Sequence, residues 1–136
     1  MNDQINKKFL ILENSLDIQP LITTRDFLSE ALAAAQNKFE IAGAIQAFEV
    51  CYELTWKTLK KVLSLNSIEV IGARDVFRLA AQKGLISDHR PWFEYQNKRN
   101  ITVHEYYDEI EKKVYPILPN FLQDLDELIA KLKQLK

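Results

Sequence analysis

Residues 41 to 63 read IAGAIQAFEVCYELTWKTLKKVL, and the spacing of the apolar side chains in this stretch decides the fold class. Large apolar residues recur at intervals of 4, 3, 4, 4, 3 and 4 positions, as Ile41, Ile45, Phe48, Tyr52, Trp56, Leu59 and Leu63. This recurrence matches the period of an α-helix, so it predicts a long helix with one broad apolar stripe. Asn66 and Ser67 are expected to end that helix.

Helical patterns continue on both sides of this stretch. Before it, a helix is predicted from about residue 18 to residue 36, because Pro20 suits a first helical turn and apolar residues follow near helical spacing. After it, residues 68 to 71 form an extended connector. A short helix is then predicted over residues 75 to 83, with Gly84 in the usual carboxyl-terminal cap position.

Two further helices complete the expected architecture. Ser87 or Asp88 is expected to cap a helix over residues 88 to 106. The last helix starts near Asp108, and its apolar residues again recur at intervals of 3 or 4. Pro116 and Pro119 fall inside this pattern, so a bend or local break is expected there.

Composition agrees with an all-α fold. The chain has 136 residues, of which 47% are hydrophobic. It has only 3 glycines and 4 prolines, which are too few for the turns of a many-stranded sheet. We therefore predict one up-and-down bundle of four to five helices over residues 17–136. Residues 1–16 contain a short apolar patch without a clear period, and we treat them as an N-terminal extension of undecided structure.

Charge and cysteine content limit the function classes. A formal net charge of −1 and a pI near 6.1 do not suit a general nucleic-acid coating protein, so any RNA or nucleotide site must be local. Cys51 is the single cysteine, and with His89 and His104 it makes no zinc-type spacing; no metal or other cofactor is expected. Neither a signal peptide nor a membrane span is recognisable, which favours the cytoplasm.

The richest cluster of chemical groups is KRNITVHEYY at residues 98–107. A histidine can take up or release a proton near neutral pH, and a guanidinium can hold two phosphate oxygens, so Arg99 and His104 suit phosphate-ester chemistry. On one helix, the side chains of Asn100, His104 and Tyr107 would form a stripe beside Arg99, Val103 and Tyr106. The alternative is a purely structural role, in which the end of a helical bundle carries a surface arginine, a hydrogen-bonded histidine and half-buried tyrosines.

The pattern of Arg99, His104 and Tyr106 resembles the Arg-x4-His-x-Tyr signature of HEPN domains, specifically the nucleotidyltransferase substrate-binding proteins. AFEVCYELTWKTLK at residues 47–60 is similar to another segment of that family, as are ARDV at residues 73–76 and GLI at residues 84–86. The resemblance covers roughly residues 17–134.

The resemblance implies a homodimer whose Arg/His helices face one cleft, and a cognate minimal nucleotidyltransferase as partner. Such pairs act as toxin–antitoxin modules, in which an RNA-cleaving toxin is neutralised by adenylylation of a tyrosine. Tyr106 would be the modified residue here, although Tyr107 follows at once and leaves the choice open.

The same resemblance implies roles for the motif residues. His104 would be the general acid/base for attack of a ribose 2′-hydroxyl on the adjacent phosphate, without a metal, and Arg99 would stabilise the charge that develops. Asn100 would orient the imidazole or bind a phosphate oxygen, unless it is a simple surface amide. Two alternatives remain: a noncatalytic subunit that binds a nucleotide or substrate for the partner, and a purely structural bundle.

Weaker candidates lie on the long helix. Glu49, Glu53 and Lys57 share one helix face, which is either solvated and ion-paired or lines the cleft and binds substrate. Tyr52 and Trp56 could stack on a base but are expected in the core.

Overall fold

The computed structural model describes residues 16–135, and every regular element in that range is a helix. This confirms the predicted all-α helical bundle. The elements are α2 (Gln19–Ala34), α3 (Lys38–Leu65), α4 (Ala73–Gln82), α5 (Arg90–His104), α6 (Tyr107–Val114), the 3₁₀ turn η1 (Tyr115–Ile117) and α7 (Leu118–Gln134). None of these helices is long and apolar enough to cross a membrane.

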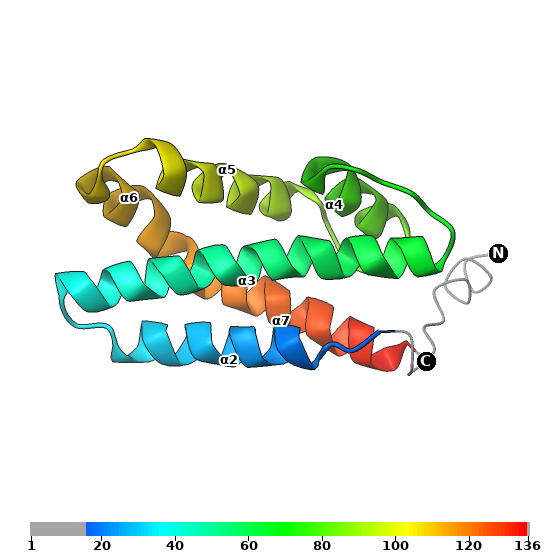
Figure 1. Cartoon of the computed structure of the whole chain (residues 1–136), viewed down its shortest axis with the longest axis horizontal. Coiled ribbons are helices and arrows are strands. Elements are labelled where there is room, and N and C mark those ends of the chain that lie inside the picture. Colours follow the sequence, from blue (N-terminus) through cyan, green and yellow to red (C-terminus); the bar gives the residue numbers. More distant parts are fainter. Residues whose placement is uncertain (1–15, 136) are drawn as a thin grey trace.

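Successive long helices run up and down against one another (Figure 1). The chain passes along α2, returns along α3, comes back along α5, and returns again through α6 and α7. The short helix α4 lies next to the start of α5, at the end of the bundle where α3 finishes. This arrangement leaves one side of α5 against α3 and the opposite side open to solvent.

The long helix α3 has clear local signals at both ends. At its start, the Asn37 side chain accepts a hydrogen bond from the Glu40 backbone N–H at 2.9 Å, which satisfies a free donor of the first turn. At its end, Asn66 caps the helix and Ser67 has a φ of 65°, the left-handed conformation that redirects the chain. The predicted end at Asn66 and Ser67 is thus confirmed.

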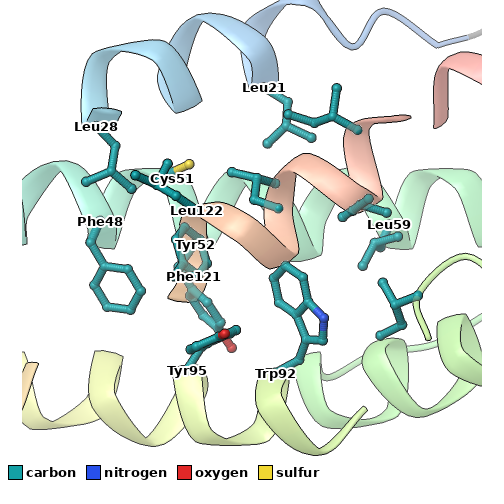
Figure 2. Packing of buried hydrophobic residues seen from close by; sticks show 14 of the residues in the cluster. Leu21, Leu28, Phe48, Cys51, Tyr52, Leu59, Trp92, Tyr95, Phe121 and Leu122 are labelled. Atoms are coloured by element: carbon teal, nitrogen blue, oxygen red, sulfur yellow. The ribbon is translucent and has the colours of Figure 1, made fainter. Parts of the chain in front are cut away.

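Aromatic side chains from three helices form the centre of the core (Figure 2). Phe121 of α7 lies edge-on to Phe48 of α3 at 4.9 Å between ring centroids, and to Tyr95 of α5 at 5.2 Å. Trp92 also contacts Phe121, at 5.8 Å, and Tyr52 is buried beside these rings. Burial of this cluster fixes which face of α5 points inward.

The helix that carries the motif is shorter than predicted. α5 begins at Arg90, where Asp88 Oδ1 accepts a hydrogen bond from the Arg90 backbone N–H at 2.9 Å, and it ends at His104. Its last turn contains Ile101, Thr102 and Val103, which are β-branched and poor helix formers.

The two tyrosines therefore do not lie on that helix, and the prediction that they extend its polar stripes is wrong. Glu105 and Tyr106 are extended, and Tyr107 starts α6. The break expected near Pro116 and Pro119 is present as η1, which separates α6 from α7. Apart from Leu16, the predicted N-terminal extension lies outside the described residues.

Candidate functional site

An open groove of about 700 Å³ lies between α3, the second half of α5 and the start of α6. Its polar lining consists largely of residues singled out in the sequence: Glu49, Glu53, Lys57, Arg99 and Tyr107. Ile45, Val50, Leu54 and Ile110 provide apolar walls. The groove thus joins a cation of the motif helix to two carboxylates and an ammonium of α3.

Arg99 is held at the floor of this groove by Glu53. Arg99 Nε lies 3.6 Å from Glu53 Oε1, while Glu53 Oε2 accepts a hydrogen bond from the Trp56 indole at 3.0 Å. The indole thereby orients the carboxylate, and the carboxylate orients the guanidinium. Arg99 Nε is buried beside this carboxylate without a hydrogen-bond partner, whereas the Arg99 side chain as a whole is 24% exposed and lines the groove, where it can contact an anionic ligand.

Glu49 makes the second link between the two helices. Thr102 Oγ1 lies 2.9 Å from Glu49 Oε2 and 2.6 Å from the Arg99 carbonyl oxygen. The hydroxyl has one proton, so it donates a hydrogen bond to one of these oxygens at a time. Thr102 lines the groove but was not singled out in the sequence. Its position three residues after Arg99, on the same side of the helix, was the available signal.

His104 and Asn100 lie away from the groove. Both side chains are exposed, and neither belongs to the groove lining. Five residues along a helix correspond to a rotation of about 140°, so Arg99 faces α3 while His104 faces solvent. Within one chain, the structure brings Arg99 together with Glu53 and Thr102, and not with His104.

The neighbouring tyrosines have different environments. The Tyr107 hydroxyl donates a hydrogen bond to the Lys38 carbonyl oxygen at 2.8 Å. Burial, with the nearby carboxylate of Glu111, raises the pKa of Tyr107 to about 12. Tyr106, in contrast, is 88% exposed on the extended segment that joins α5 to α6.

Other candidates for reactive or metal-binding chemistry are weak. Cys51 is fully buried, and burial raises the pKa of its thiol to about 12, which suits the predicted role as a small core residue. Within residues 16–135, no group of three or more His, Cys, Asp or Glu side chains could hold a metal ion.

Comparison with known proteins assigns the chain to a family. The family described as "Nucleotidyltransferase substrate binding protein like" matches residues 5–134. The chain belongs to this family. The match confirms the family resemblance that the sequence predicted.

Individual relatives support the same assignment. The chain is 41% identical, over 99 residues, to a Haemophilus influenzae protein named "Probable ribonuclease HepT", covering 69% of this chain and 68% of that protein. A Haemophilus influenzae structure, described as revealing the fold of a substrate binding domain of a nucleotidyltransferase, is 30% identical with a TM-score of 0.77, covering 87% of this chain and all of that one. A Thermus thermophilus crystal structure has the same fold at 24% identity and a TM-score of 0.77, covering 84% of this chain and 99% of that one.

Proposed function

We propose that this protein is a HEPN-type, metal-independent RNA-cleaving toxin subunit of a toxin–antitoxin pair. Its neutralising partner is a cognate minimal nucleotidyltransferase. The observation that carries the proposal is the pair Arg99 and His104 on α5, in a chain 41% identical to a protein named as a probable ribonuclease. An exposed imidazole can transfer a proton, and a guanidinium that lines the groove can stabilise charge on a phosphate, so both groups suit phosphate-ester cleavage.

The proposed reaction is an internal transfer within RNA. His104 removes the proton from a ribose 2′-hydroxyl, and the 2′-oxygen forms a bond to the adjacent phosphorus while the bond to the 5′-oxygen breaks. Arg99 stabilises the negative charge on the non-bridging oxygens. The leaving 5′-oxygen takes up a proton from water, and His104 releases its proton to the solvent, so the products are a 2′,3′-cyclic phosphate and a 5′-hydroxyl.

The test of this chemistry is incubation of the purified protein with single-stranded RNA in the presence of EDTA. We expect cleavage to continue in the chelator and the new ends to be a cyclic phosphate and a hydroxyl, identified by mass spectrometry. Loss of cleavage in EDTA, or ends with a linear 5′-phosphate, would contradict the proposed mechanism.

The active form in this proposal is a homodimer. One phosphate cannot readily contact Arg99 in the groove and His104 on the opposite side of the same helix, whereas two facing copies of α5 can supply both groups. Exposed apolar side chains flank the site: Val103 is 59% exposed on α5 and Val50 is 56% exposed on α3. Such residues suit an interface between copies.

Replacing Val103 by aspartate is expected to convert the dimer into a monomer and to lower RNA cleavage with it. A charge buried in an apolar interface costs several kcal/mol. Sedimentation equilibrium measures the mass of each form. The matched control is Ile71→Asp, which alters an 89% exposed side chain in the connector before α4 and should leave the mass unchanged. A monomeric parent protein would contradict the proposed dimer.

The partner enzyme is proposed to act on Tyr106. The exposed hydroxyl of Tyr106 is accessible to a nucleotidyltransferase, whereas the Tyr107 hydroxyl is engaged with the Lys38 carbonyl oxygen. Because Tyr106 follows His104 by two residues, a nucleotide attached there would bring negative charge beside the imidazole and block access to it.

Tyr106→Phe is expected to abolish adenylylation after coexpression with the partner, while Tyr107→Phe should leave most of it. Intact-protein mass spectrometry measures the added adenylyl mass. Tyr107→Phe serves as the matched control, because it removes the same atom from the next residue. Retention of the added mass in Tyr106→Phe, with its loss in Tyr107→Phe, would reverse the assignment.

A second candidate function is a noncatalytic subunit that binds nucleotide or substrate for the partner enzyme. It is favoured by the groove itself, where Arg99 can contact a phosphate and the acids and Lys57 can bind polar groups of a ligand. The description of the Haemophilus influenzae structure points in the same direction.

A further inference from the structure

A cationic and aromatic cluster lies on the solvent side of α5, away from the groove. The guanidinium carbon of Arg74 on α4 is 4.0 Å from the centroid of the Phe93 ring on α5, and that of Arg78 is 5.7 Å away. The imidazole of His89 lies 4.8 Å from the same ring, centroid to centroid. We call Arg74, Arg78, His89 and Phe93 the Phe93 patch. It lies where α4 packs next to the start of α5 (Figure 1).

Arg74 differs from the other arginines in having no carboxylate partner among the described residues. The others each contact an acid, in the pairs Arg25–Asp126, Arg78–Asp75, Arg90–Asp88 and Arg99–Glu53. The acids that adjoin patch residues in the sequence are also paired: Asp75 with Arg78, Asp88 with Arg90 and Glu94 with Lys98. An exposed guanidinium on an aromatic ring keeps its N–H donors for a ligand, and the contact with the ring reduces the entropy lost on binding.

The Phe93 patch continues into the motif along one face of α5. Phe93, Asn97, Asn100 and His104 follow one another at intervals of 4, 3 and 4 residues, which places them on a single stripe. Asn97, Asn100 and His104 are exposed. At 1.5 Å per residue, the stripe extends about 16 Å from Phe93 to His104. Together, the Phe93 patch and this stripe place the Arg74 guanidinium, an aromatic ring and two amides in line with the proposed catalytic imidazole.

We propose that this stripe is a second binding site, which holds single-stranded RNA outside the cleaved phosphodiester bond. Arg74 contacts a backbone phosphate, a base stacks on the guanidinium plane of Arg74 or on His89, and Asn97 donates hydrogen bonds to a base edge. The inference rests on the proposed RNA cleavage. It adds an RNA-binding surface that the groove and the motif do not include.

The binding test uses the full-length protein and a fluorescent single-stranded RNA of about 12 nucleotides, a length within known site sizes. Its riboses are 2′-O-methylated so that it cannot be cleaved. Arg74→Gln should weaken binding about tenfold at low salt, as expected for loss of a charge-assisted contact. It should also reduce the slope of the logarithm of the binding constant against the logarithm of the salt concentration by about 0.7, the value for one phosphate contact on a single strand.

Two variants separate this site from general electrostatics. Lys133→Gln removes the same charge from an exposed position near the end of α7, and it should bind RNA like the parent protein. Phe93→Leu keeps an apolar side chain but removes the ring, and it should weaken binding without lowering the salt dependence. Equal losses for Arg74→Gln and Lys133→Gln, or no loss for Arg74→Gln, would overturn the proposal.

Cleavage assays distinguish a failure of this inference from a failure of the proposed function. Arg74→Gln should slow cleavage of a long RNA and leave cleavage of a dinucleotide unchanged, because a dinucleotide cannot extend along the stripe. If the parent protein cleaves RNA and the Arg74→Gln variant is as active as the parent on both substrates, only the proposed second binding site is overturned. A parent protein that neither binds nor cleaves RNA overturns both. If the Arg74→Gln variant binds RNA like the parent protein but binds the nucleotidyltransferase less tightly, the Phe93 patch contacts a protein partner and the proposed RNA site is overturned.

Discussion

Replacing His104 by alanine is expected to abolish growth arrest and RNA cleavage in cells that express the protein without its partner. Loss of a general acid/base should lower the cleavage rate by about 100-fold or more. His104 is exposed at the last position of α5, so its removal should leave the fold and the soluble yield unchanged. The measurement is growth and total RNA integrity at matched soluble protein levels.

The control for this experiment is Lys112→Ala, which truncates an exposed side chain of α6 outside the groove and the stripe. It should remain as toxic as the parent protein. If neither the parent protein nor the His104→Ala variant affects growth or RNA integrity, the nuclease hypothesis is contradicted. A weaker affinity of Arg99→Ala for a nucleotide, measured by calorimetry, would then favour the substrate-binding subunit, because Arg99 lines the groove.

Replacing Phe121 by alanine is expected to lower the free energy of unfolding by about 3–5 kcal/mol, the usual loss for a buried aromatic residue. Phe121 is fully buried and lies edge-on to the rings of Phe48, Trp92 and Tyr95. Its removal leaves a cavity at the junction of α3, α5 and α7. Urea denaturation at one fixed protein concentration measures the change, since dimerisation would make the stability concentration-dependent.

Phe39→Ala is the matched control for the core substitution. Phe39 is 84% exposed at the start of α3, so the same truncation should change the free energy of unfolding by no more than about 0.5 kcal/mol. Similar losses for the two variants would show that Phe121 is not at the centre of the core. The comparison also tests the packing that turns Arg99 toward α3, because Trp92 and Tyr95 on α5 contact Phe121.

Local patterns in the sequence were sufficient to predict the existence and the order of the main helices. The recurrence from Ile41 to Leu63 predicted α3, and Gly84, with a φ of 82°, occupies the cap position expected after the short helix. These features depend on interactions between residues a few positions apart, which the sequence displays directly. The prolines at 116 and 119 likewise predicted a bend or local break, which is present as η1, because proline lacks the N–H that a continuous helix needs.

The end of the motif helix was harder to predict, because weak propensities compete there. Arg99, Asn100 and His104 were correctly placed on one helix, but Tyr106 and Tyr107 were not part of it. Three β-branched residues weaken the last turn, and the next segment is extended until α6 begins. Single residues at helix ends have small energetic preferences, so the surrounding fold decides the boundary.

By itself, the sequence determined the fold class, the helix order, and the motif that places this chain in its family. Only the tertiary structure decided that Arg99 turns toward Glu53 in the groove while His104 faces solvent, and that Arg74 of α4 lies on Phe93 of α5. Helical periodicity relates residues within one element. The rotation of one helix against another is set by the packing of buried side chains such as Trp92 and Phe121, which are far apart in the chain.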